Sequence, residues 1–234
     1  MRITALVALA LFLTLGTLYA QSPILVTVAS STVAVGATTP LRVTLENATS
    51  GLAGFDMTAV ITDPNVAEIS GATFPPFGDA GFDLILVTST SPGTSLRVAT
   101  VDLAGLVEPG ATGQHELVTF DVVGVLSGRS TTLELIIRAL DDEDGNPIAA
   151  TVQSATVTVE FPILAGKLSP VRDLNGDGLA EDINANGRTD FDDIVTFFFA
   201  FGDVEITGNA HVFDFNGNAL LDFDDIVTLF LQTI

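Results

Sequence analysis

Apolar and polar side chains alternate along most of the chain, from about Ile24 to Phe161. In the stretch LRVTLEN, Leu41, Val43 and Leu45 fall on one side of an extended chain, and the polar residues between them fall on the other. This period of two predicts a half-buried antiparallel strand. Similar runs occur at ILVTVAS, AGFDMTAVIT, FDLILVTS, LRVATVDL, ELVTFDVVGV, TLELIIRAL and ATVTVEF.

Turn-forming residues separate these runs, at DPN, SPG, EPG, LSG and DGNP. About nine short strands within ~140 residues, with no helix of ordinary length between them, are typical of a β-sandwich. We therefore predict a mainly β protein with an antiparallel β-sandwich of the jelly-roll type over residues 23–161. A parallel α/β sheet is excluded, because it needs helices between its strands.

The periodicity changes after the sandwich. Residues 162–171 contain KLSPV and are expected to be a linker, because Pro170 breaks helices. Beyond it, DDIVTFFFAF and DDIVTLFLQT carry apolar residues at helical spacing. We expect two short helices, with none ahead of them, in a small module over residues 172–234. Their shared core should contain Ile194, Phe197, Phe198, Phe201, Ile226, Leu229 and Phe230, but not Phe199.

The charge of the chain limits its partners. It has 29 acidic and 8 basic residues, for a net charge of -21. Such a chain repels phosphate backbones and anionic lipid headgroups and favours cations. The last 67 residues contain 13 Asp or Glu against only Arg172 and Arg188, so half of the net charge lies in this part. Nucleic acid is not expected as a partner.

The N-terminus resembles an export signal. Arg2 precedes an apolar run, and a small residue at Ala20 suits cleavage, so residues 1–20 are expected to be a signal peptide of a secreted or cell-surface protein. A retained membrane anchor is the alternative, because the run approaches the ~20 residues that span a bilayer. The chain has no cysteine, so its stability must come from packing or from metal.

The heptapeptide DFDDIVT occurs at residues 190–196 and again at 222–228, each time after a cluster of Asp and Asn. Calcium binds six to eight oxygens, which an EF-hand-type loop of twelve supplies from positions 1, 3, 5, 7, 9 and 12, with Gly at 6. The first copy has Gly187 at position 6. Its ligand positions are Asp182, Asn184, Asn186, the Arg188 carbonyl, Asp190 and Asp193.

The second copy matches the same pattern with one departure. Its ligand positions are Asp214, Asn216, Asn218, the Leu220 carbonyl, Asp222 and Asp225. Ala219 stands where Gly is expected, and a Cβ costs ~1 kcal/mol or more if that turn needs a positive φ. We expect this loop to bind calcium more weakly. A single Asp/Asn/Gly cluster is usually a solvated turn, but two matching copies with identical continuations favour metal binding.

A third pattern overlaps the first loop. Asp173, Asn175, Asp177 and the Leu179 carbonyl are in register, but position 12 is Asn184. Either this is an extra site closed by Glu181 or Asp182, or it is the true loop with residues 181–189 inserted before DFDD. We favour the extra site, so two Ca²⁺ ions are expected and a third is left open.

A duplicated calcium loop with a following helix, and without a leading helix, resembles the dockerin module of cellulosome-type assemblies. The resemblance covers about 60 residues of the module. It implies that positions 10 and 11, here Phe191-Asp192 and Phe223-Asp224, contact the partner. Because these pairs are identical, the resemblance implies a pseudo-twofold module that can dock in two orientations. Ala219, the doubled first loop and Phe-Asp at positions 10 and 11 depart from the family pattern.

The predicted sandwich resembles a cohesin domain, the receptor for dockerins. The resemblance rests on AGFDMTAVITDPNVAEIS at residues 53–70 and LDDEDGNPIAATVQSATVTV at residues 140–159. Together the two resemblances imply an exported, non-catalytic scaffold protein. Its partners would be cohesin- or dockerin-bearing proteins, with self-assembly and a link to polysaccharide-degrading or cell-surface complexes left open.

Two other classes of function are less well supported. An enzyme acting on polysaccharide needs paired carboxylates in a cleft, and the sequence shows no such pair in the sandwich and only His115 and His211 as candidate bases. A calcium-dependent, lectin-like protein is the alternative reading. It is disfavoured because the chain has no Trp and its only Tyr, Tyr19, lies in the signal segment.

Overall fold

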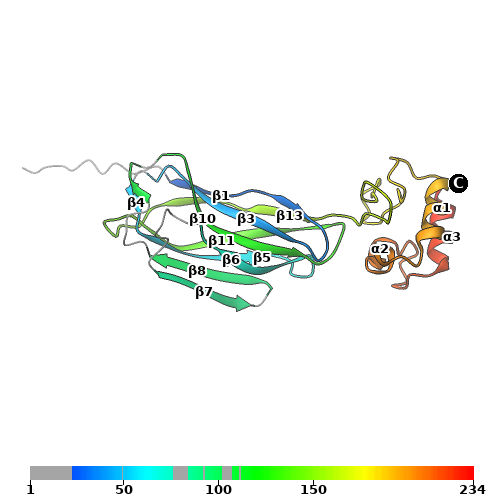
Figure 1. Cartoon of the computed structure of the whole chain (residues 1–234), viewed down its shortest axis with the longest axis horizontal. Coiled ribbons are helices and arrows are strands. Elements are labelled where there is room, and N and C mark those ends of the chain that lie inside the picture. The colour runs from blue at the N-terminus through cyan, green and yellow to red at the C-terminus, as the bar shows by residue number, and fades with distance from the viewer. Residues whose placement is uncertain (1–22, 49, 76–83, 92, 102–106, 111) are drawn as a thin grey trace, which may run out of the picture.

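A computed structural model describes residues 23–234 apart from 49, 76–83, 92, 102–106 and 111. The predicted signal segment lies outside the described residues. Figure 1 shows an elongated β-sandwich followed by a small helical module at one end. Among the described residues, no helix is long and apolar enough to cross a membrane.

Two sheets pack face to face in the sandwich. The five-stranded sheet has the order β12 (Ala150–Gln153), β1 (Ile24–Val28), β3 (Thr38–Glu46), β10 (Gln114–Gly124) and β6 (Ala67–Thr73). The six-stranded sheet has the order β2 (Ser31–Val33), β13 (Ala155–Val159), β11 (Arg129–Asp141), β5 (Gly54–Ile61), β8 (Ser95–Val101) and β7 (Leu84–Ser91). A separate ribbon pairs β4 (Ser50–Leu52) with β9 (Val107–Pro109).

The predicted sandwich is confirmed, and most neighbouring strands are antiparallel. The parallel pairs are β1 with β12 and β13 with β2. In each pair one partner, β12 or β2, is a short strand at the edge of its sheet. These short segments explain why the described chain has more strands than the nine expected. A strand of three or four residues is too short to show a period of two in the sequence.

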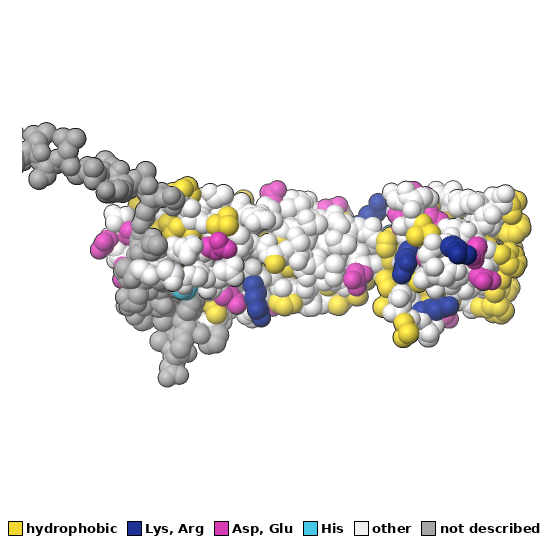
Figure 2. Space-filling model, turned by 90° about the horizontal axis from the view of Figure 1, so that it is seen from above, with side chains coloured by type: hydrophobic (Ala, Val, Ile, Leu, Met, Phe, Trp, Pro, Cys, Tyr) yellow, Lys and Arg dark blue, Asp and Glu magenta, His cyan; other side chains and the backbone are white. Residues whose placement is uncertain are grey.

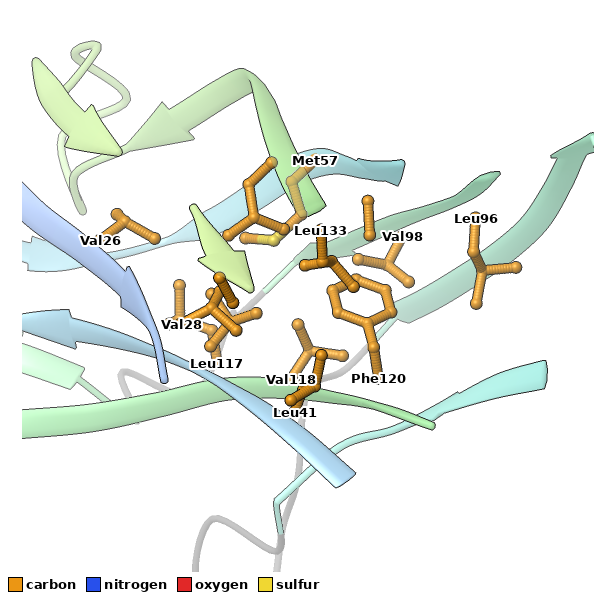
Figure 3. Close-up of a cluster of buried hydrophobic side chains, with 14 of the residues drawn as sticks. Val26, Val28, Leu41, Met57, Leu96, Val98, Leu117, Val118, Phe120 and Leu133 are labelled. Carbon is orange, nitrogen blue, oxygen red and sulfur yellow. The ribbon is translucent and has the colours of Figure 1, made fainter. Parts of the chain in front are cut away.

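The alternation in the sequence directly produces the core. Leu41, Val43 and Leu45 of β3 are buried, whereas the side chains between them face solvent. Inward residues of both sheets meet around Phe120 of β10, with Met57, Val98 and Leu133 of the opposite sheet nearby (Figure 3). Burying this apolar surface contributes the main stabilising free energy of the sandwich.

The C-terminal module has a second, separate core. Its elements are α1 (Phe191–Ala200), α2 (Val204–Thr207), the 3₁₀ turn η1 (Ala210–Val212) and α3 (Phe223–Gln232). Phe197 of α1 is fully buried and packs on Phe213 and Phe215, with ring centroids 5.6 and 5.7 Å apart. Leu164 and Val171, in the segment assigned to a linker, are also buried in this core.

The short turns α2 and η1 differ from the expectation that no helix precedes the second loop. They fill the connection between α1 and the loop that starts at Asp214. α2 has four residues and η1 has three. Elements this short do not produce a helical period of apolar residues in the sequence, so the hydrophobic pattern could not predict them.

The close approach of β5 and β8 gives a test of the fold. A Cβ on Gly54 would lie 2.5 Å from the carbonyl oxygen of Thr100, whereas one on Gly71 of β6 would have its nearest neighbour at 3.5 Å. We expect Gly54→Ala to lower the free energy of unfolding of the sandwich by about 1–3 kcal/mol through overpacking. The matched control Gly71→Ala should change it by less than about 0.5 kcal/mol. Urea unfolding followed by far-UV circular dichroism measures both, and equal effects would contradict the close approach.

Candidate functional site: duplicated acidic loops and an exposed aromatic face

The loop from Asp182 to Asp193 is folded around its own side-chain oxygens. The Asp182 carboxylate accepts hydrogen bonds from the backbone N–H groups of Asn186, at 2.8 Å, and Gly187, at 2.7 Å. The side-chain oxygen of Asn184 accepts from the same Asn186 N–H at 2.9 Å, and that of Asn186 accepts from Arg188 N–H at 2.9 Å. Positions 1, 3 and 5 therefore all turn their oxygens inward.

The loop from Asp214 to Asp225 repeats these contacts position by position. Asp214 accepts from the N–H groups of Asn218 and Ala219 at 3.1 and 2.8 Å. Asn216 accepts from Asn218, and Asn218 accepts from Leu220, at 2.9 and 2.7 Å. The duplication in the sequence is thus a duplication of local structure.

One carboxylate closes each loop and also starts the following helix. Asp193 accepts from the N–H groups of Asn184 and Asp190, both at 2.9 Å. Asp225 does the same with Asn216, at 3.2 Å, and Asp222, at 2.9 Å. Asp193 and Asp225 stand at the third helical position and form capping boxes with the N-cap residues Asp190 and Asp222.

The closing carboxylates are buried, and among the described residues no cationic side chain forms an ion pair with either of them. Asp193 and Asp225 are both 0% exposed. Burial raises the pKa of Asp193, the nearby Asp182 and Asp190 carboxylates raise it further, and the backbone hydrogen bonds oppose this shift. A buried carboxylate is costly unless a positive charge compensates it. With the other inward oxygens, the residues of both loops fit a hard divalent cation such as Ca²⁺.

The third acidic loop lies just ahead of these two. Oxygens of Asp173, Asp177 and Glu181 lie within 4.8 Å of one another. Asp173 accepts from the N–H groups of Gly176 and Gly178 at 2.6 and 2.7 Å. Glu181 is buried and accepts from Leu174 N–H at 3.2 Å, and burial raises its pKa, with Asp177 and Asp173 adding to the shift.

The structure separates this loop from the next one. Asp182 and Asn184 already direct their oxygens into the loop that ends at Asp193, and Glu181 is the carboxylate that turns toward Asp173. This arrangement favours an extra loop closed by Glu181 over a single loop with an insertion.

The backbone at Ala219, position 6 of the second loop, is strained. Its φ is 64°, in the left-handed region, and the equivalent Gly187 has a φ of 86°. Ala185 is also left-handed, with a φ of 61°. A residue with a Cβ costs roughly 1–2 kcal/mol in this conformation.

This strain predicts that Ala219→Gly stabilises the module by about 1 kcal/mol, because glycine adopts a positive φ without the steric penalty. The reciprocal change Gly187→Ala should destabilise the module by a similar amount. Thermal unfolding of the calcium-loaded protein, followed at 222 nm, measures both changes. A destabilising Ala219→Gly would show that the left-handed turn is not the source of strain.

Most aromatic side chains of α1 and α3 face solvent. Phe198 is 55% and Phe230 38% exposed, so the expectation that both lie in the helix–helix core is wrong. Phe197, Ile194, Ile226 and Leu229 do lie in the core. Helix α1 carries apolar residues on more than one side, and the core can cover only one side. We call the uncovered surface the aromatic face. It forms a groove of about 350 Å³ lined by Phe191, Ile194, Val195, Phe198, Phe199, Phe223, Ile226, Val227 and Phe230.

The aromatic face has internal twofold symmetry. The ring of Phe191 in α1 meets that of Phe230 in α3 at 6.4 Å, and the equivalent ring of Phe223 meets Phe198 at 6.4 Å. Both pairs are edge-to-face, with interplanar angles of 77° and 82°. The structure thus brings together Phe191 and Phe223, two of the residues that the sequence predicts to contact a partner. Asp192 and Asp224, the other two, are exposed beside them.

Contacts between the sandwich and the module carry no signal in the sequence. The Ser127 hydroxyl, in the turn between β10 and β11, donates a hydrogen bond to the side-chain oxygen of Asn209 at 2.8 Å. His211 Nε2–H donates to the Ser127 carbonyl at 3.0 Å. Each is an ordinary polar residue in a turn, so only the three-dimensional structure identifies the contact.

Comparison with known proteins supports the fold of the sandwich. No family model matches the sequence, and no curated protein sequence matches it. Among solved structures, a chain from the Coh-OlpA-Doc918 complex, a type I cohesin–dockerin complex from Clostridium thermocellum, is similar with a TM-score of 0.51 and 12% identity. The match covers 59% of this chain and 99% of that chain.

A second similar structure is CaCohA2 from Clostridium acetobutylicum. Its TM-score is 0.50 and its identity 15%, and the match covers 59% of this chain and 91% of that one. At such low identity the similarity shows a shared fold. The β-sandwich of this chain therefore has the cohesin fold.

Proposed function

We propose that this chain is an exported, non-catalytic adaptor that joins proteins through a cohesin-type sandwich and a calcium-dependent, dockerin-like module. The observation that carries the proposal is the aromatic face, which is built symmetrically by two copies of one loop-helix unit. Exposed apolar patches of this kind mark interaction sites. The cohesin fold of the sandwich supports the same class of function, because solved cohesins of this fold occur in complexes with dockerins.

Calcium would have a structural role in this function. Asp193 and Asp225 close the loops and cap α1 and α3, so an ion held by each loop would fix the start of each helix. The helices in turn position the Phe191–Phe230 and Phe223–Phe198 pairs. Metal binding would thereby create the docking face, because metal binding and folding are coupled. The ligands proposed for a third ion are Asp173, Asn175, Asp177, the Leu179 carbonyl and Glu181.

Metal removal tests the role of calcium. We expect chelation to unfold the module at residues 168–234, because each loop then holds several carboxylates without a compensating cation. The sandwich has its own core and should remain folded. Circular dichroism should lose the helical signal and keep the β signal, and calcium should restore the former. Loss of both signals together would contradict two separately stabilised cores.

Binding of purified cohesin domains tests the proposed function itself. We expect the calcium-loaded chain to bind at least one domain of a cohesin panel on a biosensor surface, and to release it in chelator. The double variant Phe191→Asp/Phe223→Asp should weaken binding at least 100-fold. Each single variant should weaken it only about twofold if the module docks in two orientations, since losing one of two equal states costs RT ln 2.

The two substitutions of the double variant stand at helix positions that accept an acidic residue. Phe191 and Phe223 are the first residues of α1 and α3, where acidic side chains favour a helix. Val204→Asp is the matched control, because Val204 is an exposed apolar residue of α2 outside the aromatic face. Binding that survives both the double variant and chelation would overturn the proposed function.

A further inference from the structure

The module is fastened to the end of its own sandwich. Ser127 is fully buried between the two parts, where it bonds to Asn209 and His211 of the module. Beside it, the guanidinium of Arg129 in β11 covers Gly178 of the third acidic loop, where a Cβ would lie 2.9 Å away. The ring of Phe161 covers Gly128 in the same way, at 2.6 Å. Polar and packing contacts therefore form a defined joint.

This joint turns the aromatic face away from the sandwich. Figure 1 shows α1 and α3 at the outer end of the module, and Figure 2 shows hydrophobic side chains gathered over that end. The turn at Ser127 contacts the opposite side of the module, around α2 and η1. While the joint is formed, the aromatic face cannot reach the sheets of its own chain, and a partner must come from another molecule.

The sandwich offers two broad outward surfaces, one on each sheet, and they differ in charge. On the six-stranded sheet, Arg97 pairs with Asp56 through two hydrogen bonds of 2.8 and 2.5 Å. Arg138 donates to Thr58 beside them at 3.2 Å, and Glu134 and Asp141 are the other charged residues that face outward among those described for these strands. Two cations and three anions leave this part of the surface close to neutral, with a net charge of -1.

The same neutral surface is partly apolar. Ile136 of β11 lies opposite Thr58 on β5, and Leu86 of β7 lies opposite Ala99 on β8, so both point outward. They are 48% and 50% exposed. We call this surface, formed by β7, β8, β5 and β11, the neutral sheet face. Within a chain of net charge -21, it combines exposed aliphatic side chains with two arginines.

The outward surface of the five-stranded sheet is acidic instead. Among the outward-facing residues described for β3, β10 and β6, Arg42 is the one with a positive charge. It is opposed by Glu46, Glu68, Glu116 and Asp121, so one positive charge against four negative ones leaves a net charge of -3. The aromatic face carries Asp192 and Asp224 at its edge. Like-charge repulsion disfavours the acidic surface, and the neutral sheet face fits in both apolarity and charge.

We propose that the aromatic face of one chain docks on the neutral sheet face of a second copy, head to tail. The inference rests on the proposed function and names the partner of its docking site. The contact is heterologous, because two different surfaces meet, so each added chain presents a free aromatic face at one end and a free sheet face at the other. Association therefore does not stop at a dimer unless the chains close into a ring.

Complementation between two full-length variants tests this inference. Phe191→Asp/Phe223→Asp removes the aromatic face, and Leu86→Glu/Ile136→Glu places two acidic residues on the neutral sheet face. In calcium, we expect the wild-type mature chain to form species larger than a dimer as concentration rises. Each variant alone should be a monomer, and their equimolar mixture should form a one-to-one dimer, because each retains the surface that the other lacks. Light scattering after size exclusion measures all four samples.

The controls separate docking from folding. Arg42→Glu on the acidic surface and Val204→Asp on α2 should associate like the wild type, and circular dichroism should show every variant folded. If Leu86→Glu/Ile136→Glu still self-associates like the wild type, the aromatic faces pair with each other and the head-to-tail contact is wrong. A wild-type chain that stays monomeric in calcium also overturns self-docking. The proposed function is then judged separately by the cohesin panel, so the two failures are distinguishable.

Discussion

Two buried carboxylates, those of Asp193 and Asp225, connect the parts of the C-terminal module. Each accepts two backbone hydrogen bonds that close an acidic loop, and each is also the third residue of the helix that follows. A fully buried anion in this position is costly without a compensating cation. The stability of the loop, the start of the helix and the placement of the aromatic rings therefore depend on one electrostatic requirement, which arises once in each loop.

The sandwich relies on a different force. Its core joins the inward residues of two sheets around Phe120, and apolar burial stabilises it. The joint at Ser127 connects this core to the module through a few hydrogen bonds and close contacts. Such a joint has consequences for function, since it decides where the aromatic face points.

Much of this organisation was predictable from sequence because it is local. The alternation in β3 predicts a strand, and the spacing of Asp, Asn and Gly predicts loops whose side-chain oxygens turn inward, as Asp182 and Asp214 do. The loop position of Ala219 also raised the question of a positive φ, and the structure has one there. Each of these features depends on neighbours within about a dozen residues, so the order of residues is enough to specify it.

The helices show the limit of such predictions. The sequence places Phe197, Phe198 and Phe230 on helices, but their spacing cannot say which side is covered. Phe197 is buried against Phe213 and Phe215, whereas Phe198 and Phe230 remain exposed and form the aromatic face. Which side of an apolar helix becomes core depends on what packs against it.

By itself, then, the sequence determined the longer strands of the sandwich, the duplicated acidic loops and the helices that follow them. Only the tertiary structure decided the assignment of Glu181 to its own loop, the exposure of the aromatic face and the joint that turns this face outward. The physical reason is the range of the contacts. Ser127 and His211 are 84 residues apart, and no periodicity or motif reports a hydrogen bond between two ordinary turn residues at that separation.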